Sequence, residues 1–165
     1  MPVRVGKEVQ EVLRVEAVSA SESQLPWYAA GLRFACTQCG RCCSGAPGHV
    51  WVVAEDIDRL AAHLGLSPAE FNRRHVRRVG LGRSLLERRG GDCEFLARDG
   101  DGLTRCLIHP VRPVQCRTWP FWRSNVESAE DWQATARDCP GIGRGSTHTL
   151  AVIQEALRHN GDRPL

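Results

Sequence analysis

Cysteines dominate the chemistry that this sequence can support. Four of them lie within residues 36–43 as a CxxCxxCC motif, and four more follow singly. The eight are Cys36, Cys39, Cys42, Cys43, Cys93, Cys106, Cys116 and Cys139. Thiolates are soft ligands, and three of them on one tight loop can hold a zinc ion or an iron–sulfur cluster. We therefore predict that these cysteines are metal ligands and that the cofactor is an iron–sulfur cluster or zinc.

The spacing leaves the grouping of the cysteines open. A CxxCxxC loop followed far downstream by Cys-Pro is similar to the arrangement that holds a cubane in bacterial ferredoxins. On that basis the first set is Cys36, Cys39, Cys42 and Cys139. Adjacent side chains point apart in extended backbone, so the second set is Cys43, Cys93, Cys106 and Cys116. The alternative is one centre with four or five ligands and the remaining thiols free and buried.

Ligand type alone does not separate zinc from iron, because both accept four thiolates. Zinc sites built from four cysteines usually draw on two CxxC knuckles, and this chain has one such cluster. We therefore favour an iron–sulfur cluster over zinc. Arg112 and Arg117 are candidate hydrogen-bond donors to cluster sulfurs, and His109 is the histidine nearest the ligand cysteines in the sequence.

The bulk properties are those of an ordinary globular chain. A length of 165 residues predicts one domain, residues 1–165, and the net charge is +3. The N-terminus lacks the apolar segment of a secretory signal, and no apolar run approaches the roughly 20 residues of a membrane helix. We expect a cytoplasmic protein, where thiols stay reduced and four disulfides are the less favoured reading. The expected partner is a metal ion or cluster, with a protein partner next and nucleic acid less favoured.

Hydrophobic periodicity predicts a small α+β domain with short helices, a β-hairpin and irregular metal-stabilised loops. Its cysteine-cluster core is residues 34–142. The expected elements are helices over 8–18, 55–64, 67–79 and 147–159, a strand over 49–53, and a hairpin over 93–108. Residues 109–122 hold three prolines and are expected to be mostly irregular.

The hairpin register decides whether two of the cysteines face each other. A two-residue turn at Asp99-Gly100 places Cys93 directly opposite Cys106, where two thiolates could share a metal. A turn at Asp101-Gly102 would shift the register and separate them. We expect the first arrangement.

The cysteine pattern resembles the YkgJ-like CxxCxxCC cysteine-cluster family, described as zinc- or iron-chelating proteins; a related cluster occurs in flagellin lysine methylases. The resemblance spans about residues 34–142. It is carried by Cys36, Cys39, Cys42, Cys43, Cys93, Cys106, Arg112, Cys116, Arg117 and Pro120. The resemblance implies that the cysteines chelate metal, with Cys139 extending the set, and it implies no particular reaction. His109 is a departure, because the family commonly has tyrosine there.

Three functions are consistent with this sequence. The first is a cytoplasmic metal-binding protein with a redox, metal-handling or accessory role. The second is a zinc-stabilised module that binds nucleic acid or protein, suggested by the arginines of residues 73–78. The third is a metal-dependent protein-modifying or redox enzyme. Whether the chain is an enzyme is left open, because no catalytic motif stands out beyond the cysteine cluster.

Overall fold

The computed structural model describes residues 25–45, 47–100 and 104–161. The helix expected over residues 8–18 lies outside these ranges. The described elements are β1 (Leu32–Phe34), α1 (Ala54–Leu64), α2 (Pro68–His75), β2 (Val76–Val79), β3 (Gly82–Leu85), β4 (Leu96–Arg98), β5 (Thr104–Cys106), α3 (Val114–Thr118), α4 (Arg123–Val126), α5 (Ala129–Asp138), β6 (Ile142–His148) and α6 (Leu150–Asn160), with short 3₁₀ turns η1 (Arg41–Cys43) and η2 (His109–Val111). The predicted α+β class is confirmed. None of the helices in the described ranges is long and apolar enough to cross a bilayer.

One hydrophobic core forms around α1, α2, β2 and β3. Its buried residues, which we call the α1 core, are Val52, Ile57, Leu60, Ala61, Phe71, Leu85, Phe95 and Ile108. The predicted helix pair is confirmed, and Gly65 ends α1 in the left-handed conformation. The predicted capping box also forms at the start of α2, where the Glu70 amide donates to Ser67 Oγ and the Ser67 amide donates to Glu70 Oε2.

The expectation that the second helix continues to Val79 is wrong. The helix ends at His75, and Val76–Val79 form strand β2, paired with β3 in the register Val76↔Leu85 and Val79↔Gly82. Val76 packs against the α1 core, so tertiary pairing of a β-branched residue outweighs the local helical pattern. The strand expected over 49–53 is reduced to a single bridge, Trp51↔Ser84, although Val52 N donates to Arg83 O at 3.0 Å.

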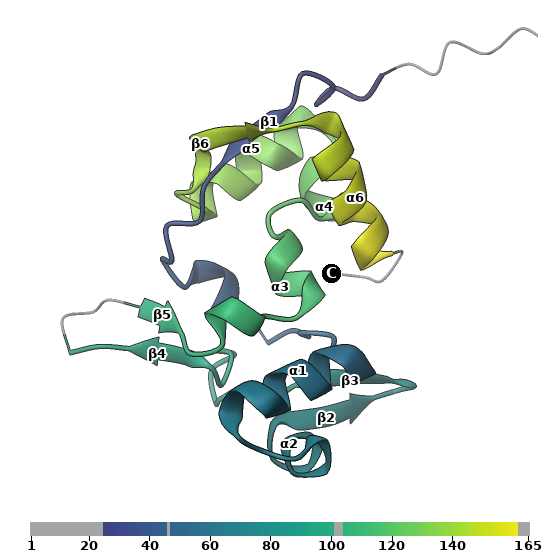
Figure 1. The fold of residues 1–165 in the computed structure, drawn as a ribbon. Helices are drawn as coiled ribbons and strands as arrows, with labels where there is room; N and C mark the ends of the chain where they lie inside the picture. The colour runs from purple at the N-terminus through teal and green to yellow at the C-terminus, as the bar shows by residue number, and fades with distance from the viewer. Residues whose placement is uncertain (1–24, 46, 101–103, 162–165) are drawn as a thin grey trace, which may run out of the picture.

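A second core lies at the other end of the molecule, among β1, β6, α4, α5 and α6 (Figure 1). Its buried residues, which we call the α6 core, are Leu32, Phe121, Val126, Trp132, Ile153 and Ala156. Strand β1 pairs antiparallel with β6, which lies far downstream in the chain. Strand β6 and helix α5 were not anticipated, and the last described helix begins at Leu150 rather than residue 147.

Short helix α3 lies between the two groups of elements (Figure 1). On the side of the α1 core, the buried Gln115 accepts a hydrogen bond from Trp51 N at 2.8 Å and donates one to His49 O at 2.9 Å. On the other side, Asn160 of α6 donates to Thr118 Oγ1 at 2.7 Å. These side chains fix α3 against both cores, and Cys116 lies in the middle of this helix.

The α1 core gives a direct test of the fold. Leu60 is 0% exposed, so Leu60→Ala removes buried apolar volume and should lower the free energy of unfolding by about 2–5 kcal/mol. Leu81 is 102% exposed, so Leu81→Ala should change it by less than about 0.5 kcal/mol. Urea denaturation of both variants measures the difference. Equal stability of the two variants would contradict this assignment of the core.

Candidate metal centre

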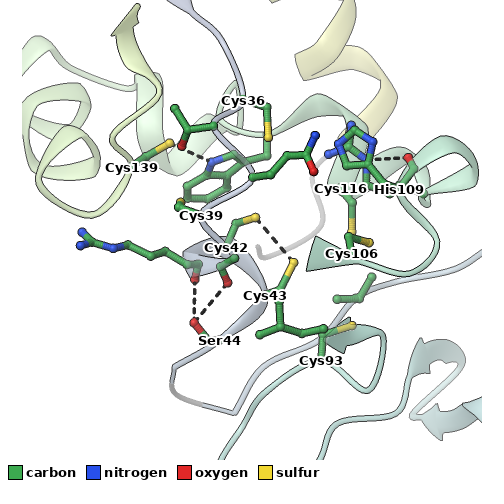
Figure 2. Close-up of a pocket in the computed structure, with 18 of the residues that line it drawn as sticks. Cys36, Cys39, Cys42, Cys43, Ser44, Cys93, Cys106, His109, Cys116 and Cys139 are labelled. Carbon is green, nitrogen blue, oxygen red and sulfur yellow. Dashed lines mark hydrogen bonds between the residues drawn. The ribbon is translucent and has the colours of Figure 1, made fainter. Parts of the chain in front are cut away.

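All eight cysteines line one cavity of about 470 Å³ (Figure 2). The wall draws on both ends of the molecule, with Leu85 and Ile108 from the α1 core and Phe34 from the edge of the α6 core. Every one of the eight thiols is free. Cysteines from five separate stretches of chain therefore line one cavity at the junction between the two cores.

The CxxCxxCC loop is shaped by a glycine and held by the hairpin. Gly40 has φ 71°, and Cys43 N donates to Gly40 O at 2.9 Å to close the turn η1. Thr104 Oγ1 of β5 donates to Gln38 O at 2.9 Å. A side chain at Gly40 would meet Thr104 Oγ1 at 2.7 Å and Leu96 Cδ1 at 2.9 Å. Positive φ and close packing thus both require glycine between the second and third cysteines.

The predicted hairpin register is wrong, although both of its cysteines reach the cavity. Strand β4 pairs with β5 as Leu96↔Cys106, a register that neither two-residue turn gives and that separates Cys93 from Cys106 along the ladder. Cys93 lies before β4, where its amide donates to Cys43 O at 2.7 Å and residue 93 bridges to Glu87. Contact with the CxxCxxCC loop, rather than cross-strand pairing, brings Cys93 to the site.

Cys139 enters the cavity from the α6 side. It follows the last residue of α5, and its amide donates to Thr135 O at 2.9 Å. The chain then crosses the start of the cysteine loop, where Ala35 N donates to Gly141 O at 3.1 Å. This crossing brings the segment of Cys139 against the residue that precedes Cys36.

Burial dominates the electrostatics of the recessed thiols. It raises the pKa of Cys93 from 9.0 to about 11, and it raises the pKa values of Cys106 and Cys116. The hydrogen bond between the thiols of Cys42 and Cys43, at 3.7 Å, lowers the pKa of Cys42 to about 7, and the Arg112 cation acts in the same direction. The same bond, with burial, raises the pKa of Cys43. Buried thiols of this kind need added positive charge before they ionise.

Electrostatic effects on the thiol pKa values indicate which cysteines are neighbours. The charges of Cys93 and Cys116 raise the pKa of Cys43, and the charge of Cys106 raises the pKa values of Cys93 and Cys116. Cys42 lies beside this group, since its charge affects Cys43, Cys106 and Cys116. Within the described ranges no three Cys, His, Asp or Glu side chains converge closely enough to hold an ion as they stand. The thiols are instead spread around the cavity wall, so metal binding would require them to come closer together. The number and softness of these donors fit a thiolate-bound metal.

Of the two arginines and the histidine predicted to lie near the cysteines, two line the cavity and one lies elsewhere. Arg112 and His109 line the cavity, and Arg112 Nε donates to His109 O at 3.0 Å. Burial, with Arg112 close by, lowers the pKa of His109. Arg117 is exposed and lines a different cavity, beside Trp51 and Arg59. Arg112 is thus placed to interact with the thiols, whereas Arg117 is not.

Two residues that matter for the site had no assigned role in the sequence. Gln115 precedes Cys116 and carries the buried hydrogen bonds that fix α3, but an isolated glutamine gives no pattern signal. Trp119 lines the cavity, and its indole Nε1 lies 3.5 Å from Cys139 Sγ.

Comparison with known proteins agrees with this geometry. The model of the CxxCxxCC family, described as "Putative zinc- or iron-chelating domain", matches residues 35–140, and the chain belongs to this family. An uncharacterised protein of Methanocaldococcus jannaschii is 29% identical over 113 residues, which cover 68% of this chain and 58% of that relative. The chain therefore matches little more than half the length of this relative. No solved structure matches the chain.

The shape of the cysteine loop can be tested at Gly40. Gly40→Ala forces a side chain into positive φ and against Thr104, so it should lower the free energy of unfolding by more than about 1 kcal/mol. Gly100→Ala is the matched control, because a side chain there meets nothing within 4 Å. Chemical denaturation of the metal-free protein measures both. Unchanged stability in Gly40→Ala would contradict the close packing of this loop on the hairpin.

The position of α3 can be tested at Gln115. Gln115→Leu leaves the Trp51 amide and the His49 carbonyl without their partner, at a cost of about 1–3 kcal/mol for each buried group left unpaired. Gln133→Leu changes an exposed glutamine on α5 and should have little effect. Thermal and urea unfolding compare the two. Equal behaviour would show that Gln115 does not hold α3 in place.

Proposed function

We propose that the eight-cysteine cavity is a metal centre, with iron–sulfur favoured over zinc, and that the protein serves in redox chemistry, metal handling or support of another enzyme. The observation that carries this proposal is that all eight cysteines, from five separate stretches of chain, line one cavity. Membership of a family described as zinc- or iron-chelating supports it. Eight free thiols also support a location in a reducing compartment, for which we propose the cytoplasm.

The neighbouring charges favour two sets of ligands. Mutual interactions among Cys43, Cys93, Cys106 and Cys116 support a recessed set. The remaining four, which we call the loop set, are Cys36, Cys39, Cys42 and Cys139. The loop set comes from the cysteine loop and from the segment that crosses it at Ala35 and Gly141. The expectation that the side chains of Cys42 and Cys43 point apart is wrong, because their thiols share a hydrogen bond at 3.7 Å. The two sets therefore lie in contact, and the charges of Cys42 and Cys36 both act to raise the pKa of Cys106.

Arg112 has a clear part in such a centre. Its cation helps to lower the pKa of Cys42 and opposes the burial that raises the pKa values of Cys106 and Cys116, and its backbone oxygen accepts a hydrogen bond from Arg59. It therefore compensates some of the negative charge that several thiolates would bring into the cavity. A bound iron–sulfur cluster would supply one-electron redox chemistry, whereas zinc would supply structural cross-linking.

Metal content of single variants tests the proposal and its two sets. Protein purified without oxygen should contain stoichiometric iron with sulfide and absorb visible light, or contain stoichiometric zinc and be colourless. If there are two centres, Cys116→Ser and Cys39→Ser should each lose one centre and keep the other, and each should melt at a lower temperature because metal binding contributes to folding. Elemental analysis, absorption spectra and calorimetry make these measurements.

Thr37→Ala is the control, since Thr37 lines the same cavity and lies between the first two cysteines without being a thiol. It should keep the full metal content. If the protein binds one equivalent of metal, and only Cys116→Ser removes it, then the recessed set alone forms a single centre and the two-set arrangement is wrong. Wild-type protein that binds neither iron nor zinc under reducing conditions would overturn the proposed function.

A further inference from the structure

An indole side chain contacts the sulfur of Cys139, the cysteine with the smallest exposed fraction among the eight. Trp119 Nε1 lies 3.5 Å from Cys139 Sγ, and both residues line the cavity. An indole N–H can only donate, so the sulfur is the acceptor. Cys139 is 7% exposed, whereas the other seven cysteines are half-buried or exposed.

Both partners of this hydrogen bond are held in place by their surroundings. The ring of Trp119 packs edge-to-face against Trp122, with centroids 4.7 Å apart and planes at 85°. Trp122 is in turn fixed, because its own indole N–H donates to Gln115 O at 3.0 Å. Cys139 is held by the hydrogen bond that its amide donates to Thr135 O. The hydrogen bond from Ala35 N to Gly141 O fixes the segment that follows it. The indole N–H is therefore preorganised toward the sulfur.

A hydrogen bond of this kind is much stronger when its acceptor is charged. A neutral thiol is a weak acceptor, and a rigid donor aimed at it contributes little to stability. The same donor aimed at a metal-bound thiolate withdraws electron density from sulfur. Outer partners of this type orient ligands and tune affinity, and hydrogen bonds to sulfur help to set the potentials of iron–sulfur centres.

We propose that Trp119 is a positioning residue that tunes the Cys139 thiolate as a metal ligand through its indole N–H. This inference rests on the proposed function, because it needs a metal in the cavity. It also assigns Cys139 as a ligand, on the ground that the structure directs a fixed donor at that sulfur. Loss of the donor raises the energy of the sulfur lone pairs, so charge transfer from sulfur to metal then requires less energy.

The test uses the full chain loaded with cobalt(II), which occupies tetrahedral thiolate sites and absorbs visible light. Trp119→Phe should move the sulfur-to-cobalt band to longer wavelength and weaken binding by at least about tenfold. Trp27→Phe is the matched control: it removes an indole outside the cavity whose N–H donates to the backbone carbonyl of Val126, so the band should stay in place. If the protein carries an iron–sulfur cluster, Trp119→Phe should also make its reduction potential more negative.

Further variants separate the possible outcomes. Cys139→Ser should alter the cobalt spectrum, and adding Trp119→Phe to it should cause no further band shift. If Trp119→Phe does not fold, benzothienylalanine at position 119 keeps the ring shape without the N–H and should give the same shift. An unshifted band in a folded variant, or an unchanged spectrum in Cys139→Ser, overturns this inference while the metal centre stands. Failure of the wild type to bind any metal overturns the proposed function first.

Discussion

The constraint that governs this structure is the cost of burying sulfur atoms that must become negative to bind a metal. Burial raises the pKa values of Cys93, Cys106 and Cys116, so without a cation these groups remain neutral. A cavity lined by such thiols is poised for a positively charged occupant, because the occupant supplies the charge that the surroundings withhold. Arg112 provides part of that charge permanently, which limits the repulsion between neighbouring thiolates.

The fold meets this constraint by placing the cavity between two small hydrophobic cores instead of inside one. Neither core encloses the cysteines by itself, so elements that contact both cores determine the geometry of the site. Helix α3 is the clearest case: Gln115 binds backbone on the α1-core side and Thr118 binds Asn160 of α6. Such hydrogen bonds are directional, so they fix the orientation of α3 and with it the position of Cys116 in the cavity wall.

Local signals predicted the parts of the fold that depend on neighbouring residues. The capping box of Ser67 and Glu70 and the apolar spacing of α1 are contained in a few consecutive residues, and the structure has them as expected. The strand β2 was missed because its pairing with β3 overrides a helical pattern that continues past His75. The pairing of β1 with β6 joins segments far apart in the chain, so no local pattern could reveal it.

The candidate site shows the same division. Residue chemistry alone identified the eight cysteines, and the structure brings all of them to one cavity. The contacts that bring the cysteines to the cavity could not be predicted from the sequence, as the register of the hairpin and the contact between Cys93 and Cys43 show. Gln115 and Trp119 act through contacts with particular neighbours, and such contacts exist only once the chain has folded.

The wide separation of the cysteines along the chain has a consequence for biosynthesis. The loop that contains Cys36 leaves the ribosome before Cys139 and before the strand that pairs with β1. A nascent chain therefore carries the first cysteines of the cavity before the last one has been made. Until that last segment emerges, the cavity lacks the part of its wall that Cys139 provides.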